Sequence, residues 1–263
     1  MGMIYVIGND INEGTLSEVS PVDVADAIYP MANMYNLAQS MPWRMTTNAG
    51  YLIIDLGVGF TEPMCLGIMN HNLLGTSVAD PFVFTISADD DAPDWNNPDW
   101  GPTTIPYHAH NIFYIIPSAE RNHRWWRIDW DDPDNSALEF GEIVLKAYST
   151  FSMPFWWPYR EGLDYIVDEN VTHYGRRHRV KRAKKKSFKI DFDGVTDANL
   201  VSEVEAFFEN LDGDNPFIFV PEADETDSWY MECLNNLDAQ RLFIDRSKFS
   251  LRLEEQSRGI VLG

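Results

Sequence analysis

The sequence "RWWRIDW" (124–130) shows the spacing of apolar residues from which the fold of this chain can be predicted. From Trp126 onward apolar and charged residues alternate, which is the period of a β-strand with one buried face. Neighbouring residues of a strand point to opposite faces, so Trp125 and Trp126 lie on different sides, as do Arg124 and Arg127. We therefore predict that at least one of the two tryptophans fills a core between two sheets.

Short strand-like segments surround this stretch in the first half of the chain. Each is apolar or alternating and is bounded by turn residues such as Gly, Pro, Asn or Asp. Many short strands separated by turns predict a β-sandwich. The segments lie at 51–57, 65–72, 82–93, 110–119 and 141–148.

The second half adds one helix to a set of strands. The segment "TDANLVSEVEAFFENLDGD" predicts a helix at about 197–211, capped by Thr196 or Asp197 and ended by Gly213. Four strand-like runs follow it, so we expect an α+β β-barrel or sheet with one packed helix. The apolar stripe of the helix consists of Leu200, Val201, Val204, Phe207, Phe208 and Leu211.

The 263 residues are expected to form two domains, at 1–150 and 151–263, with 149–169 as a connection between them. No apolar run is long enough to cross a membrane, and the N-terminus lacks the pattern of a signal peptide. We expect no membrane partner. The two cysteines are interpreted as small buried apolar residues.

Charge is distributed unevenly along the chain. Nine of its 20 Lys and Arg residues lie in 176–189, a segment without acids, whereas the remainder carries 11 basic and 41 acidic residues. This basic band therefore belongs to a strongly acidic protein whose field repels DNA, which makes nucleic acid a less favoured partner.

No sequence motif for catalysis or phosphate binding is present, so we expect no enzyme and no cofactor. His108 and His110 are two residues apart, but no third metal ligand is obvious near them. Asp89, Asp90, Asp91, Asp94 and Asp99 could supply oxygens to Ca²⁺, yet they lack EF-hand spacing. We interpret these residues as a solvated acidic loop and predict no metal site.

Several motifs in the first half occur in the order found in a known family. They are "SMPWRMTTNAGYLIIDLG" (40–57), "MNHNLLGT" (69–76), "FTISADD" (84–90) and "IPSAERNHRWWRIDW" (116–130). Together they resemble the discoidin, or galactose-binding-like, jelly roll over about 40–148. The resemblance implies an N-terminal jelly-roll β-sandwich in a mainly β protein.

The second half resembles structural proteins of long-tailed bacteriophages over about 160–260. The pattern is a basic strand, the helical segment and the strands "WYMECL" and "KFSLRLEEQSRG". It resembles tail-tube and distal-tail proteins, in which a β-barrel with one helix assembles into a ring. The usual domain order of distal-tail proteins is reversed here.

The two resemblances imply a virion protein, made in the host cytoplasm, that acts as a baseplate or tail-tip ring subunit. Its partners would be copies of itself and other tail proteins. The alternative is a carbohydrate-binding module for a cell-surface glycan, and a nucleic-acid-binding protein is a third hypothesis. The residues proposed for glycan binding or a protein interface are Asn70, His71, Asn72, Trp95 and Trp100.

The basic band is expected at a subunit interface, because so many like charges in a row need anions close by. Acidic patches of neighbouring copies or of an adjacent tail protein would supply those anions and orient the assembly. The residues assigned to this interface are Arg177, Arg179, Lys181, Arg182, Lys184, Lys185 and Lys186.

Overall fold

The protein divides into two compact units. The N-terminal unit comprises Gly8–Ser149 and Asp224–Ser228, and the C-terminal unit comprises Met1–Ile7, Thr150–Ala223 and Trp229–Gly263. The structure, a computed structural model, describes residues 3–12, 15–20, 30–36, 42–74, 83–90, 93–109, 111–135, 137–152, 159–171, 177–195, 198–211, 215–222, 227–235, 240–243 and 246–256. Within these ranges, no helix is both long and apolar enough to span a membrane.

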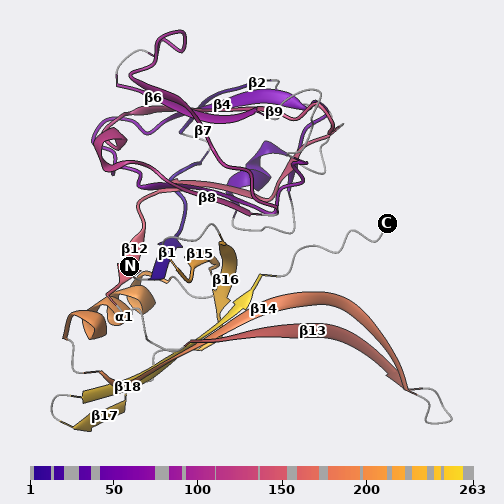
Figure 1. Cartoon of the computed structure of the whole chain (residues 1–263), viewed down its shortest axis with the longest axis vertical. Helices are drawn as coiled ribbons and strands as arrows, with labels where there is room; N and C mark the ends of the chain where they lie inside the picture. Colours follow the sequence, from indigo (N-terminus) through magenta and orange to yellow (C-terminus); the bar gives the residue numbers. More distant parts are fainter. Residues whose placement is uncertain are drawn as a thin grey trace. The chain divides into compact units, whose positions relative to one another are not determined.

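The N-terminal unit is a β-sandwich whose two main sheets form separate layers (Figure 1). The five-stranded sheet has the order β2 (Leu16–Ser20), β4 (Ala49–Asp55), β9 (Trp125–Asp131), β6 (Val83–Asp89) and β7 (Trp100–Thr104). The three-stranded sheet has the order β11 (Glu142–Lys146), β5 (Cys65–Met69) and β8 (Asn111–Ile115).

Smaller elements complete this unit. A two-stranded sheet joins β3 (Trp43–Arg44) to β10 (Glu139–Phe140), and the 3₁₀ helices η1 and η2 span Met31–Tyr35 and Ser118–Glu120. The predicted mainly β fold with a jelly-roll sandwich is confirmed.

The alternation read from "RWWRIDW" places β9 in the core as predicted. Trp126, Ile128 and Trp130 are buried, whereas Trp125 and Arg127 on the other face are partly exposed. The buried face packs in a cluster drawn from both sheets, because each sheet has one apolar face to remove from water.

In the residues that the structure describes, the C-terminal unit is one sheet with one helix. The sheet has the order β12 (Ser149–Phe151), β1 (Met3–Ile7), β15 (Phe217–Val220), β16 (Trp229–Cys233), β18 (Arg246–Glu255), β14 (Arg177–Val195) and β13 (Tyr159–Val171). The remaining strand, β17 (Gln240–Phe243), pairs with β18.

The described strands form an open sheet that ends at β12 and β13, so the barrel form of the prediction is wrong and the sheet form holds. Two further expectations also fail. Residues 3–7, assigned to the N-terminal domain, form β1 and pair with β15 of the C-terminal unit. The segment 149–169, expected to be a connection, contains strand β12 and most of β13.

Helix α1 (Ala198–Asn210) forms where its apolar period predicts it. Leu200, Val204 and Phe207 are buried in one cluster with residues of the sheet. Leu211 is buried as well, while Val201 and Phe208 pack partly buried against the same cluster. The proposed caps, Thr196 and Asp197, and the stop at Gly213 lie outside the described residues.

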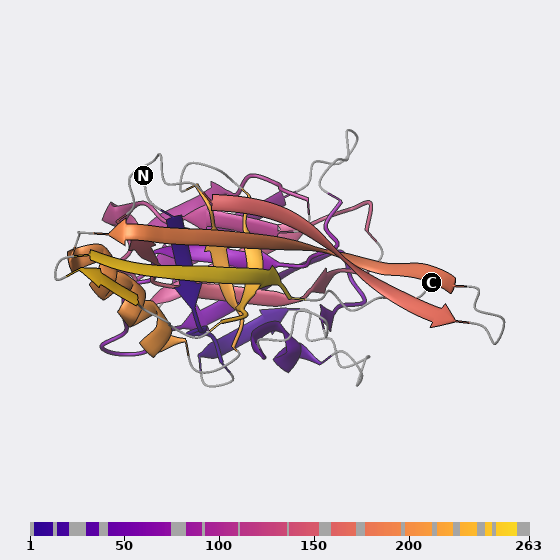
Figure 2. The ribbon, with the colours of Figure 1, turned by 90° about the horizontal axis from the view of Figure 1, so that it is seen from below.

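Strand β14 is much longer than its pairing with β18. That pairing covers Ser187–Val195, whereas residues 177–186 pair with 163–171 of β13. We call 163–171 and 177–186 the β13–β14 arm. Figure 2 shows the two strands running on together past the end of β18. The basic band therefore lies mostly on a two-stranded ribbon.

Candidate functional site

Aromatic and charged side chains meet on the outer face of the five-stranded sheet. Strand register sets Tyr51 of β4 opposite Asp129 of β9, with Arg127 two residues away on the same face. The Arg127 guanidinium lies 4.3 Å from the centroid of the Tyr51 ring and 5.9 Å from that of Trp95, in the β6–β7 loop. We call Tyr51, Trp95, Arg127 and Asp129 the aromatic–arginine patch.

Asp129 fixes the arginine of this patch. Arg127 Nε donates to both carboxylate oxygens of Asp129 at 2.9 Å, and Nη2 donates to Oδ1. The two side chains are 24% and 28% exposed, so their remaining donor and acceptor positions reach water. Tyr51 and Trp95 are also only partly buried. The patch thus presents two ring surfaces beside a preorganised charged pair.

A second arginine–aromatic pair lies at the other end of the same sheet face. Arg124 precedes β9, so its side chain reaches this face and not the opposite one that alternation predicted. Arg124 donates from Nε and Nη2 to the two oxygens of Asp55, each at 2.6 Å, and its guanidinium lies 5.1 Å from the Trp125 ring centroid. These hydrogen bonds lower the pKa of Asp55 below its usual value, although burial partly opposes them. The pair keeps Asp55 ionised and holds Arg124 in place.

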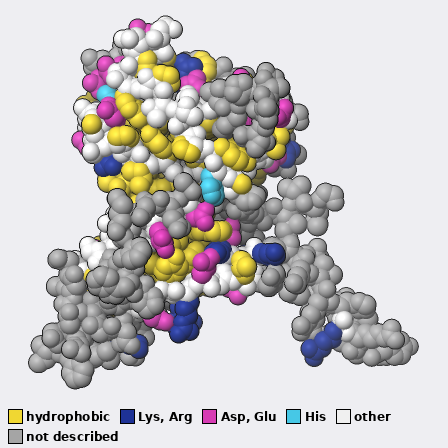
Figure 3. Space-filling model, in the orientation of Figure 1, with side chains coloured by type: hydrophobic (Ala, Val, Ile, Leu, Met, Phe, Trp, Pro, Cys, Tyr) yellow, Lys and Arg dark blue, Asp and Glu magenta, His cyan; other side chains and the backbone are white. Residues whose placement is uncertain are grey.

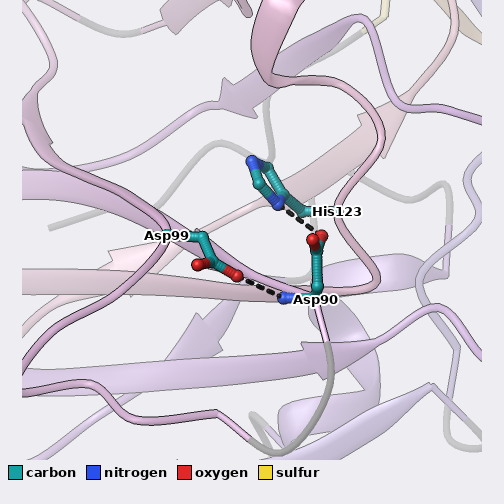
Figure 4. Close-up of side chains that lie close together, drawn as sticks. All are labelled: Asp90, Asp99 and His123. Carbon is teal, nitrogen blue, oxygen red and sulfur yellow. Dashed lines mark hydrogen bonds and ion pairs between the residues drawn. The ribbon is translucent and has the colours of Figure 1, made fainter.

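The ends of the β6–β7 loop meet the segment that precedes β9. Asp90 follows β6, Asp99 precedes β7, and His123 comes from the segment after η2 (Figure 4). His123 Nδ1 lies 2.7 Å from Asp90 Oδ1, and the Asp90 amide donates to Asp99 Oδ2 at 3.1 Å. One potential ligand atom from each residue lies within 4.8 Å of the others, so these three side chains could hold a metal ion.

The residues predicted to bind a glycan lie in different parts of the N-terminal unit. Trp95 belongs to the aromatic–arginine patch. Trp100, by contrast, packs edge-on against the buried Trp126, with ring centroids 6.1 Å apart. Much of the Trp100 side chain therefore supports the core.

Asn70, His71 and Asn72 follow β5 in the other main sheet. Asn72 bonds the backbone of 137–139 with its side chain, and the buried His71 ring accepts from the Leu73 amide at 3.2 Å. The Asn70 amide donates to Asn111 Oδ1 at 2.9 Å. The contacts described for these three residues hold the local chain and include neither Trp95 nor Trp100. Their role in ligand binding stays a prediction.

The basic band is partly neutralised by acids of its own unit. Lys185 pairs with Glu254 at 2.6 Å, and Lys186 pairs with Glu161 and lies 4.9 Å from the Trp229 ring centroid. Arg177 and Lys184 are exposed. The side chains of Arg179, Lys181 and Arg182 lie outside the described residues, and the interface role of the whole set stays a prediction.

Sequence reasoning missed Tyr51, Arg127, Asp129 and His123 as site residues. Alternation in 124–130 was sufficient to put Arg127 and Asp129 on the outer face, but only strand register brings Tyr51 to them. No local pattern marks His123. The other histidine pair does not form a described cluster, since His108 pairs with Asp227 at 2.9 Å and His110 lies outside the described residues.

One face of the N-terminal unit is mixed in chemistry. Figure 3 shows hydrophobic side chains over the visible face of the N-terminal unit, interrupted by acidic and basic ones. Polarity alone therefore does not identify a binding site on the described part of this face. The contacts of individual residues are needed to identify one.

No protein-family model matches the chain, and no curated protein matches it significantly. Solved structures similar to it include carbohydrate-binding modules. A chitosan-binding module from a chitosanase/glucanase of Paenibacillus sp. IK-5 has 11% identity and a TM-score of 0.40, covering 54% of this chain and all (100%) of that one.

Two more similar structures are a fragment of a larger protein and a carbohydrate-binding module. A fragment of a putative chitobiase from Bacteroides thetaiotaomicron has 16% identity and a TM-score of 0.34, covering 51% of this chain and 89% of that one. The family 32 carbohydrate-binding module of AlyQ, solved with 4,5-unsaturated mannuronic acid, has 16% identity and a TM-score of 0.28, covering 49% and 94%.

Similarities at these TM-scores carry no argument about function. The similar structures named here include no phage tail protein, so the tail, baseplate and ring roles predicted from sequence have no support in these comparisons.

Proposed function

We propose that the N-terminal unit binds a glycan through the aromatic–arginine patch, without catalysing a reaction on it. The observation that carries the proposal is the arrangement of two partly exposed rings, Tyr51 and Trp95, around an arginine that Asp129 holds in place. Aromatic faces stack on the C–H faces of sugar rings, and fixed charged groups hydrogen-bond to hydroxyls.

Each group has a separate task in this proposal. Trp95 provides the larger apolar surface, and its position in a loop lets it approach a ligand from the side of the sheet. Arg127 donates to hydroxyl oxygens, and Asp129 accepts from hydroxyl hydrogens with the lone pairs that Arg127 does not use. Their mutual hydrogen bonds lower the entropy lost when a ligand binds.

The test uses the full chain on a glycan array, followed by calorimetric titration with any glycan that binds. Trp95→Ala should weaken binding at least about tenfold, since loss of a stacking partner removes on the order of 1–3 kcal/mol. Arg127→Gln should weaken it too. Tyr148→Ala is the matched control, because Tyr148 is also an aromatic residue beside an arginine, with Arg121 5.8 Å from its ring centroid.

The proposal predicts that Trp95→Ala keeps the melting temperature while it loses binding. It is wrong if no glycan binds, or if Trp95→Ala and Arg127→Gln both bind a glycan as tightly as the unmodified protein.

A further inference from the structure

The cluster of Asp90, Asp99 and His123 joins three segments that are separate in sequence. Asp90 and Asp99 stand at the two ends of the loop that carries Trp95, and His123 precedes β9. Figure 4 shows the His123 ring and the Asp90 carboxylate pointing toward each other, with Asp99 beside the Asp90 backbone. The ligand atoms of all three lie within 4.8 Å of one another, close enough to share one small cation.

His123 distinguishes this cluster from a group of solvated acids. Its side chain is only 8% exposed. A polar ring that is buried to this extent needs specific hydrogen-bonding or charged partners. Nδ1 faces Asp90, and Nε2 lies 3.6 Å from Glu120 Oε2, within ion-pair distance but beyond hydrogen-bonding geometry. A carboxylate on the far nitrogen is the usual partner of a metal-binding histidine, because it orients the ring and leaves the near nitrogen for the metal.

We infer that Asp90, Asp99 and His123 form a binding site for a divalent transition-metal ion of the zinc class, which clips together the two ends of the β6–β7 loop. One imidazole nitrogen and two carboxylate oxygens make a mixed nitrogen and oxygen donor set, which suits zinc-like ions better than Ca²⁺. Water would complete the coordination. On binding, the metal takes the place of the hydrogen bond between Nδ1 and Asp90, and the single ring proton of neutral His123 then sits on Nε2, facing Glu120.

The two hydrogen bonds that now join the cluster fit this inference. They hold the carboxylates of Asp90 and Asp99 at the loop ends without an ion, so little rearrangement is needed when one binds. The inference differs from the expectation, drawn from sequence, of a solvated acidic loop without a metal site, and the titration below decides between the two. The inference does not depend on glycan binding, because metal binding is measured with the metal alone.

The experiment is calorimetric titration of the tag-free, chelator-treated full chain with ZnCl₂, and separately with CaCl₂. We expect one saturable Zn²⁺ site, a higher melting temperature with Zn²⁺, and no comparable effect of Ca²⁺. Asp99→Asn should weaken Zn²⁺ binding at least tenfold, as should Asp90→Asn. Both substitutions preserve shape and replace a carboxylate oxygen by a poorer ligand.

Asp94→Asn is the matched control. Asp94 is an exposed residue of the same loop, it loses the same charge, and it is not one of the three cluster residues. Zn²⁺ binding that stays unchanged in both Asp90→Asn and Asp99→Asn would place the metal elsewhere and overturn the inference. Absence of saturable Zn²⁺ binding would overturn it too, and an Asp99-dependent site that prefers Ca²⁺ would overturn the assigned metal class.

Discussion

The two units of this protein remove their apolar surface from water in different ways. In the N-terminal unit two sheets face each other and share a core that includes Trp126, Phe84 and Leu145. In the C-terminal unit one sheet depends on a single helix, whose Phe207 contacts Tyr5, Phe151 and Phe217 edge-on. A sandwich thus spreads its stability over many strand contacts, whereas the single sheet concentrates it on one helix face.

This difference also determines where each unit has surface available for binding. The sandwich presents the outer face of a well-supported sheet, so a rigid patch can be built there from β4 and β9. In the C-terminal unit, β13 and β14 extend together past the end of β18 and form a two-stranded arm. Two-stranded ribbons alone are marginally stable in water, so the arm is the part of the sheet that depends most on its own ion pairs and on partners.

The largest expected effect comes from placing a charge under the helix. Phe207 is 0% exposed, so Phe207→Asp loses its packing and also buries a carboxylate. The expected loss exceeds the roughly 3–5 kcal/mol that a Phe→Ala change costs in a core. Thermal unfolding should show the transition of the C-terminal unit at a much lower temperature, while that of the N-terminal unit stays in place.

Glu205→Gln is the control for this change, since Glu205 is exposed on the same helix. Glu203 also lies off the apolar stripe, but it is unsuitable as a control because it accepts hydrogen bonds from the Ser152 amide and hydroxyl. A normally melting Phe207→Asp protein would show that the helix contributes little to the core.

The second effect concerns the sandwich. Trp126 is 0% exposed and donates from Nε1 to the His123 carbonyl at 2.9 Å. Trp126→Ala should cost about 3–5 kcal/mol and lower the melting of the N-terminal unit selectively. Trp125→Ala, on the partly exposed face of the same strand, should cost far less. Equal losses for the two tryptophans would mean that alternation along β9 does not decide which side chain is structural.

A third prediction tests the interface proposed for the basic band. Arg177 and Lys184 are exposed residues of the arm. Lys185 and Lys186 pair with Glu254 and Glu161 of their own unit. If the arm docks on an acidic surface of another copy, the double change Arg177→Gln with Lys184→Gln should reduce self-association in sedimentation, as should rising salt.

The control for the change in the arm removes two positive charges at another place on the same sheet. Lys248→Gln with Arg252→Gln does so at two exposed positions of β18. A protein that sediments as a monomer at every salt concentration, or that binds DNA tightly instead, would rule out the subunit interface.

The smallest effect is expected from the partly exposed pair of Asp55 and Arg124. The pKa of Asp55 is lowered in the folded protein, chiefly by hydrogen bonds from Arg124, so folding is favoured while the carboxylate is ionised. This stabilisation is fully present above the usual aspartate pKa of about 3.9 and is lost as pH falls through the lowered value. Asp55→Asn should cost about 1 kcal/mol or less at pH 7.

Urea unfolding at pH 7 and at decreasing acidic pH measures this linkage. The difference between the unmodified protein and Asp55→Asn should narrow as the pH falls below 4. A difference that stays constant with pH would mean that the pair does not contribute through the charge of Asp55.

The sequence by itself determined the β-strand character of the N-terminal unit and the position of the helix. Both follow from periods that are local in the chain: two residues in β9, and 3.6 residues along 200–211. Such periods record which face of an element is apolar. For that reason the burial of Phe207 and Leu211, and of at least one of Trp125 and Trp126, could be predicted without knowing what packs against them.

Only the tertiary structure decided which strands pair and which side chains meet. The pairing of β1 with β15, across more than two hundred residues of chain, and the open ends of the C-terminal sheet depend on strand order, which no local period encodes. The same reason explains the sites. Tyr51 meets Arg127 through the register of β4 with β9, and Asp90, Asp99 and His123 meet because the fold brings three chain segments together.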